Sequence, residues 1–150
     1  MKTRKITKRE VDENYYRIWN AFVDLLAMEK YDELAPEQRP AHLVFWYESE
    51  VQNGGHLQYF ENRGTKYLEE TIEALGILGA EGHQKILREA ADLFLGRERP
   101  LIQTTEAYSA VALEGEFEDL DFRFGACLPS LFECLKAHLA LHQSSFVVIT

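Results

Sequence analysis

The sequence has two cysteines, four prolines and no long apolar run among its 150 residues. Cys127 and Cys134 lie seven residues apart on one predicted helix, about 10.5 Å along its axis, which excludes a disulfide between them. We therefore interpret both as reduced thiols in the core. Because no run of eighteen apolar residues occurs, no segment is predicted to span a bilayer.

The N-terminus also lacks the apolar stretch of a signal peptide, so we expect a cytoplasmic protein. Hydrophobic residues make up 46% of the chain and charged residues 27%, a composition typical of globular proteins. A chain of this length can bury a core without disulfides or a metal. We therefore treat residues 1–150 as a single domain.

Basic residues are unevenly distributed. The first nine positions contain five bases and no acid: Lys2, Arg4, Lys5, Lys8 and Arg9. They carry +5, so the net charge of −9 leaves −14 on residues 10–150. A body this acidic repels nucleic acid and membranes and attracts basic protein surfaces. Residues 1–7 are predicted to be a flexible arm, too short to favour direct nucleic-acid binding.

Apolar residues recur at spacings of three and four, which predicts an all-α fold with a bundle of six or seven helices. Thr7 and Glu10 fit a capping box, from which one helix is predicted to run to about Met28. The other predicted helices cover residues 41–52, a short stretch after position 55, 65–78, 81–95, a segment from 104 or 105, and 128–142. Residues 143–150 have strand-like composition and are predicted to form a C-terminal arm on the body or on a partner.

The stretch from Trp46 to Gly64 is predicted to form a helix, a corner and a second helix. Asn53, Gly54 and Gly55 can adopt the positive φ that ends a helix, and Gly64 provides a second stop. We interpret these four residues as a structural hinge rather than a catalytic turn. Neither of the common glycine-rich phosphate-binding motifs is present.

One cluster of carboxylates lies on the helix predicted over residues 65–78. Glu69, Glu70 and Glu73 are spaced so that their β-carbons are about 5 to 6 Å apart. Each DNA strand displays one charge per about 3.4 Å of axis, so a helical row of carboxylates can approximate a row of phosphates. The cluster is therefore a candidate for binding a basic partner, and the alternative is a solvated helix face.

A denser cluster lies in residues 113–122, which are predicted to be a loop without any basic residue. Crowded like charges repel one another and cost stability, which favours a binding role. The candidate partner-binding residues here are Glu114, Glu116, Glu118, Asp119 and Asp121.

His138 and His142 suggest an alternative function, a metal-dependent enzyme or metal-binding protein. They lie four residues apart on one helical face, the spacing that metal sites use. His56, His83 or Glu133 could supply a third ligand. Since histidine is also favoured at a helix C-terminus by the helix dipole, we prefer the reading without a metal.

The hinge carries a family resemblance. The motif E-V-x-N-G-G-x-x-Q-Y-F at residues 50–60, with Asn62, Gly64 and the later Phe117-Glu118-x-Leu120-Asp121, resembles a bacterial domain family of otherwise unknown function. The best-known member of that family is an acidic DNA-mimic protein. The resemblance covers roughly residues 8–142.

The resemblance implies an α-helical homodimer without a cofactor. It further implies a non-enzymatic protein that presents carboxylates where DNA presents phosphates. The expected partner is a basic DNA-binding protein, a transcription factor or another nucleic-acid-binding protein. Direct nucleic-acid binding and membrane binding are not expected.

Overall fold

The computed structural model describes residues 1–150 and is mostly helical, which confirms the all-α fold class. The helices are α1 (Lys8–Glu13), α2 (Tyr16–Met28), α3 (Arg39–Arg63), α4 (Leu68–Ile77), α5 (Glu81–Leu95), α6 (Thr105–Ala112), α7 (Glu118–Ala126) and α8 (Leu131–His142). Two single 3-10 turns, Tyr31–Glu33 and Gln143–Ser145, and two strands, β1 (Arg4–Ile6) and β2 (Val147–Ile149), complete the chain. None of the helices is by itself long and apolar enough to cross a membrane.

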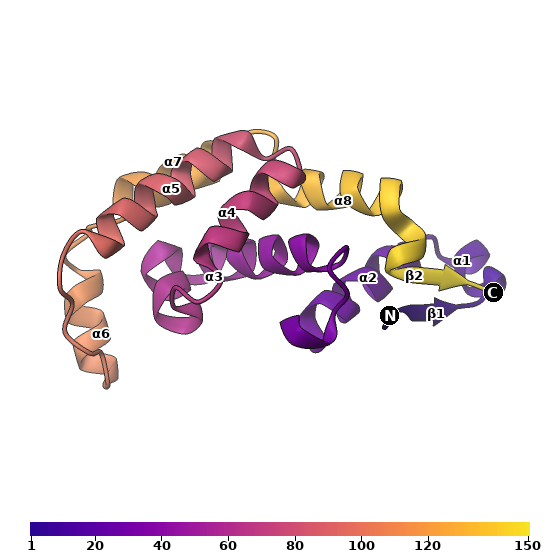
Figure 1. Cartoon of the computed structure of the whole chain (residues 1–150), viewed down its shortest axis with the longest axis horizontal. Helices are drawn as coiled ribbons and strands as arrows, with labels where there is room; N and C mark the ends of the chain where they lie inside the picture. Colours follow the sequence, from indigo (N-terminus) through magenta and orange to yellow (C-terminus); the bar gives the residue numbers. More distant parts are fainter.

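The long helix α3 lies at the centre of the molecule and packs against α2, α4, α7 and α8 (Figure 1). Its backbone leaves the helical conformation at Gly54 (φ −150°) and Gly55 (φ +72°) and resumes at once, so the predicted corner is confirmed. Both halves of α3 are buried on several sides. Tyr47 before the corner and Phe60 after it are among the largest fully buried side chains of the core.

The two ends of the chain pair with each other. Strands β1 and β2 are parallel, with Arg4 opposite Val147 and Ile6 opposite Ile149. Residues 1–7 are predicted to be a flexible arm, but Arg4–Ile6 within it form a strand, because the C-terminal strand satisfies their backbone groups. The side chain of Gln38 donates to the carbonyls of Lys2 and Ser145 at 2.6 and 2.7 Å, which ties both ends to the body.

The capping box of Thr7 is present, but the helix it starts does not run to Met28. Asn14 adopts an extended conformation, and its side-chain oxygen accepts a hydrogen bond from the amide of Tyr16 at 3.0 Å. An asparagine that bonds the backbone in this way competes with the helix. The predicted single helix is therefore divided into α1 and α2.

The region after residue 113 differs most from the prediction. Residues 118–126 form helix α7, because Leu120 and Phe124 are buried one turn apart and the acids of the first turn suit the helix dipole. Helix α8 begins only after its cap, Ser130. Cys127 therefore lies outside the helix that carries Cys134, contrary to the prediction of one shared helix, and both thiols are free.

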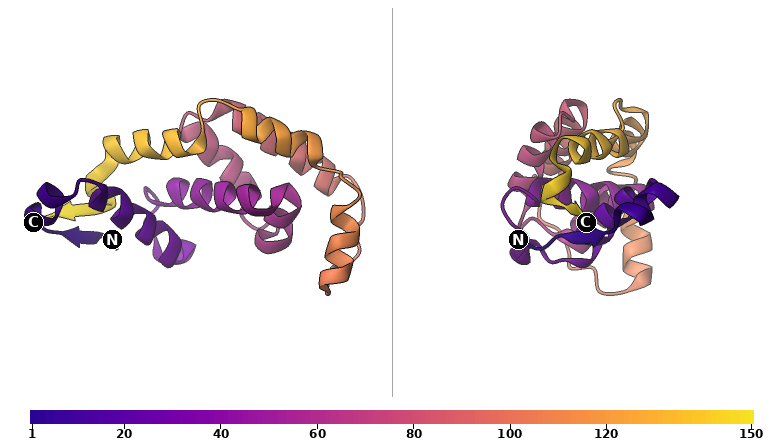
Figure 2. Two further views of the ribbon diagram at one scale, coloured as in Figure 1. Left: turned by 180° about the vertical axis from the view of Figure 1, so that it is seen from behind. Right: turned by 90° about the vertical axis from the view of Figure 1, so that its right-hand side faces the viewer.

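The molecule is elongated (Figures 1 and 2). The paired strands and both termini lie at one end, and α6 lies at the opposite end. Between them, α5 and α7 run side by side across the central helix. The acidic segment around residue 114 connects α6 to α7 at the end remote from the termini.

Candidate functional site

The first carboxylate cluster lies on the outer side of α4. Helix α4 buries Leu68, Thr71, Ile72, Ala74 and Leu75 on its inner side. Glu69, Glu70 and Glu73 are all exposed, and none of them forms an ion pair within the chain. This cluster is therefore a row of uncompensated negative charge on a rigid helix.

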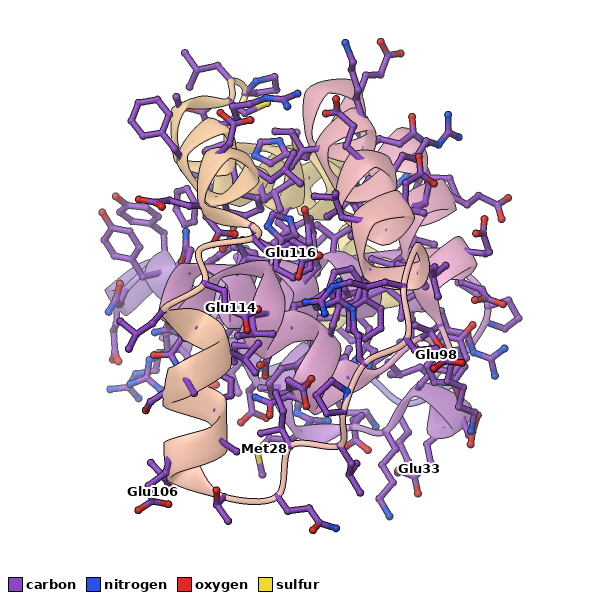
Figure 3. The ribbon with its side chains drawn as sticks, turned by 90° about the vertical axis from the view of Figure 1, so that its left-hand side faces the viewer. Met28, Glu33, Glu98, Glu106, Glu114 and Glu116 are labelled. Atoms are coloured by element: carbon purple, nitrogen blue, oxygen red, sulfur yellow. The ribbon has the colours of Figure 1, made fainter.

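The second cluster is partly neutralised by residues that precede it in the chain. Glu116 accepts hydrogen bonds from Arg99 at 2.6 Å and from Arg97 at 3.0 Å, and these two guanidinium groups lower its pKa to about 2. Glu114 lies 3.6 Å from Arg97. Figure 3 shows Glu114 and Glu116 at the junction of α6 and α7, with Glu106 at the other end of α6. The expected repulsion within this segment is therefore relieved by Arg97 and Arg99.

Glu118 and Asp119 lie in the first turn of α7 and remain available. Glu118 is exposed and forms no ion pair. The carboxylate of Asp119 is 81% exposed, and its closest cation, Arg123, is 3.6 Å away. An exposed pair at this distance contributes little and leaves the carboxylate free for a partner.

Asp121, in contrast, points into the fold. Its Oδ1 atom accepts hydrogen bonds from the backbone amide of His56 at 2.8 Å and from Nδ1 of the same residue at 2.6 Å. The amide belongs to the first turn after the corner of α3, so Asp121 acts as the cap of the second half of that helix. This carboxylate is engaged in holding the corner.

The hydrogen bonds continue from His56 into the core. The phenol oxygen of Tyr47 lies 2.7 Å from Nε2 of His56, and both side chains are fully buried. Burial raises the pKa of Tyr47 well above its usual value. Although an acid, an imidazole and a phenol in line could move a proton, neither ring reaches solvent. The arrangement therefore joins the two halves of α3 to α7 rather than forming an active site.

Other polar residues of the motif also face inward. Glu50 is 8% exposed and accepts hydrogen bonds from Asn62 at 2.7 Å and from Gln58 at 3.2 Å. Arg63 lies 3.7 Å from the same carboxylate. Since a buried charge is tolerated only when it is paired and hydrogen-bonded, Gln58, Asn62 and Arg63 explain how Glu50 can lie inside. Asn53 donates to Gln58 at 3.1 Å on the outer side of the corner.

His138 and His142 lie together, with ring centroids 4.5 Å apart. His138 is only 8% exposed, and burial, with His142 as a smaller cause, lowers its pKa to about 4. Of the residues considered as a third ligand, His56 is bonded to Asp121, and His83 lies against Phe124 at 5.0 Å. No three His, Cys, Asp or Glu side chains are close enough together to hold a metal ion.

The sequence analysis did not anticipate the roles of Arg97 and Arg99. Both lie in the exposed connection before α6, and no spacing rule links that connection to a segment 17 residues further on. The one available signal was opposite charge: two arginines are followed by the densest group of acids. The bond between Asp121 and His56 had no local signal, because 65 positions separate the two residues.

A family model described as DMP19-like protein matches residues 32–142. The matched stretch runs from the 3-10 turn before α3 to the end of α8 and includes the corner, the α4 carboxylates and α7. No curated protein and no solved structure matches the chain.

Proposed function

The chain belongs to the DMP19-like family, and from this premise we propose that it is a non-enzymatic acidic protein that acts as a DNA mimic. DMP19 is named as a DNA mimic protein. In this proposal, exposed carboxylates of the chain occupy the basic face with which a partner protein binds DNA. The partner is a transcription factor or another nucleic-acid-binding protein.

The observation that carries the proposal is the row of unpaired carboxylates on α4. Glu69 and Glu73 lie four residues apart on one side of the helix, about 6 Å along the axis, and Glu70 lies beside them. Lysine and arginine side chains that contact successive phosphates of a DNA strand meet charges about 3.4 Å apart along the axis. The carboxylates are more widely spaced along their axis, but a rigid helical row offers those side chains a comparable series of fixed negative charges.

The structure allows the candidate residues to be ranked. Glu69, Glu70, Glu73, Glu118 and Asp119 are exposed and only weakly compensated within the chain. Glu116 is bonded to Arg97 and Arg99, Glu114 lies 3.6 Å from Arg97, and Asp121 is bonded to His56. A partner would have to displace an existing hydrogen bond to use Glu116 or Asp121, and Glu114 lies beside the same Arg97 guanidinium that binds Glu116. We therefore assign the main role to the first five residues.

Association of this kind weakens as salt is added, because the contacts are between exposed charges. The dependence should be smaller than for DNA, since a folded protein does not carry the condensed counterions of a nucleic acid. The homodimer implied by the resemblance stays a prediction, and light scattering of the purified protein checks it.

The test begins with affinity capture of partners from a lysate of the native host, followed by addition of duplex DNA. We expect a DNA-binding protein to be retained and then released by the DNA. If duplex DNA does not release the retained proteins, the DNA-mimic proposal is contradicted.

The recovered partner then allows a charge-matched comparison. The triple variant Glu69→Gln, Glu70→Gln, Glu73→Gln should bind at least tenfold more weakly. A control variant neutralises three other exposed acids, Asp12, Glu37 and Glu106, and so changes the net charge equally. If both variants weaken binding to the same extent, total charge rather than the α4 row determines affinity, and the assigned site is wrong.

A further inference from the structure

A cavity of about 430 Å³ lies between the end of α2, the 3-10 turn that follows it, both halves of α3 and the start of α4. Pockets that bind small molecules are commonly about 300–1,000 Å³. Much of the wall is aromatic, formed by Tyr31, Trp46, Tyr59 and Tyr67. The ring centroids of Tyr31 and Tyr67 lie 4.0 Å apart, so these two rings pack against each other as one aromatic unit of the wall.

Three cations line this cavity, although the body of the protein is strongly acidic. The guanidinium carbon of Arg63 lies 3.8 Å from the ring centroid of Trp46, and its only ion-pair contact is the 3.7 Å approach to Glu50. Lys30 and Lys66 form no ion pair, and the Lys66 ammonium lies 5.2 Å from the ring centroid of Tyr67. Most of the donors on these three side chains are free.

Two acids also line the cavity, but neither cancels the cations. Glu29 is already bound by Lys2 at 2.9 Å and by Arg4 at 3.1 Å. Asp32 accepts a hydrogen bond from the Tyr67 hydroxyl at 3.3 Å and is the one acid without a cation partner. Lys30 and Lys66 are unpaired and Arg63 is only loosely paired with Glu50, against one uncompensated carboxylate, so the cavity has an excess of positive charge.

His42 supplies a hydrogen-bond acceptor in the same wall. Its Nδ1 atom lies 3.0 Å from the carbonyl of Leu26, which can only accept, so Nδ1 carries the proton. Burial lowers the pKa of His42, which favours the neutral ring. The second nitrogen, Nε2, makes no hydrogen bond within the chain and can therefore accept one from a ligand.

We propose that this cavity binds a small planar molecule that carries an anionic group, either a purine phosphate or an aromatic carboxylate. The ring of the ligand lies against the aromatic wall, and the anion is bound by Arg63 and Lys66. A ring N–H or amino group donates to Nε2 of His42. The proposal does not rest on the DNA-mimic function, because its residues and its charge differ from those of the carboxylate clusters.

The two tryptophans allow a site-resolved test. Trp46 lines the cavity and donates its indole N–H to Leu26 at 3.2 Å, whereas Trp19 packs against Phe132 in a separate groove. We would follow both indole signals by proton–nitrogen NMR while adding adenosine monophosphate, indole-3-carboxylate, adenosine or inorganic phosphate. A Trp19→Phe variant assigns the signals.

The expected result is a saturable shift of the Trp46 signal with at least one of the two planar anions, while Trp19 stays unchanged. Adenosine, which lacks the anion, and phosphate, which lacks the ring, should each bind at least tenfold more weakly. No shift of Trp46 with either planar anion would overturn the proposal. Equal binding of adenosine would overturn the role of the anion.

Variants complete the test. Arg63→Ala should weaken binding at least tenfold, and Lys66→Ala about threefold or more. Arg88→Ala, an exposed arginine on α5 without an ion pair, is the matched control and should bind as the parent does. Lys66 is exposed, so its variant keeps the test valid if Arg63→Ala lowers stability. Unchanged affinity in both the Arg63 and Lys66 variants would contradict the assigned anion contacts.

Discussion

The carboxylate of Asp121 lies 2.6 Å from the Nδ1 atom of His56, and the same oxygen accepts the backbone amide of His56 at 2.8 Å. One side chain of α7 thus caps the second half of α3 and fixes the orientation of a buried imidazole. Nε2 of that imidazole reaches Tyr47, on the other side of the corner. The bend in the central helix is therefore held by a residue that the sequence suggested for a partner.

Replacing Asp121 with alanine should destabilise the fold. The substitution removes a helix cap and leaves a buried imidazole N–H without an acceptor, for a combined cost of about 2–4 kcal/mol. Asp121→Asn retains an acceptor and should cost less. Urea denaturation followed by circular dichroism measures both. Asp119→Ala, an exposed neighbour, is the control and should change stability by less than about 0.5 kcal/mol.

Gly55→Ala should be more harmful than Gly79→Ala, although both glycines have positive φ, +72° and +74°. A β-carbon at position 79 meets nothing within 4 Å, so that variant incurs only the backbone cost, about 1–2 kcal/mol. At position 55 the β-carbon would collide with the carboxylate of Asp121. We expect an additional loss of about 1 kcal/mol or more from this collision, measured by thermal and urea unfolding. Equal losses in the two variants would show that the corner tolerates the added carbon.

Glu116 should contribute stability that disappears in acid. Arg99 and Arg97 lower its pKa to about 2 in the folded protein, below the usual 4.5 of a glutamate. As the pH falls, the Glu116 carboxylate is therefore protonated in the unfolded chain before it is protonated in the folded protein. The stability that Glu116 contributes is present above about pH 4.5 and is lost as the pH falls towards 2. Because the pair is partly solvated, we expect Glu116→Gln to cost roughly 1–2 kcal/mol at pH 7.

The check is urea unfolding of the parent and the Glu116→Gln variant at pH 7 and at pH 3. The difference between the two proteins should shrink at the lower pH. Glu118→Gln, which removes an exposed acid without an ion pair, should show no such change. A Glu116 effect that is independent of pH would rule out the ion pair as its cause.

His138 should change the stability of the fold in a higher pH range than Glu116 does. Its pKa is lowered to about 4 by burial, so the unfolded chain binds this proton first as the pH falls below 6.5. Stability is therefore lost between about pH 6.5 and 4, by roughly 1–3 kcal/mol. In His138→Leu this part of the loss should be absent, and removal of the unpartnered Nε2 should not reduce stability at pH 7. His142→Gln, at an exposed position and only the smaller cause of the lowered His138 pKa, should retain most of the loss.

The same variant tests the metal alternative. A metal bound by His138 and His142 would stabilise the folded protein, and His138→Leu would abolish that gain. We expect zinc to leave the unfolding temperature of the parent unchanged, because no third ligand lies nearby. A zinc-dependent increase that is lost in His138→Leu would favour the metal-binding reading.

The sequence by itself determined most of the helices, the corner and the overall charge. Apolar spacing is set by the 3.6-residue period of the helix, so α5 and the buried face of α4 could be predicted from neighbouring residues alone. The corner was predictable because few residues other than glycine tolerate the backbone conformation at Gly55. Net charge depends only on composition. The motif at residues 50–60 likewise carried the family resemblance.

Only the tertiary structure decided which carboxylates are free. Glu116 and Glu69 look alike in the sequence, yet Glu116 is bound by Arg99, whereas Glu69 has no cation partner. The strand at Arg4–Ile6 also became visible only with its partner 143 residues further along the chain. Ion pairs and strand pairs form between residues that are close in space. The spacing of side chains along one helix or strand carries no information about which distant residues come close. The cavity around Arg63 is formed by several separate elements for the same reason, so no sequence pattern predicted it.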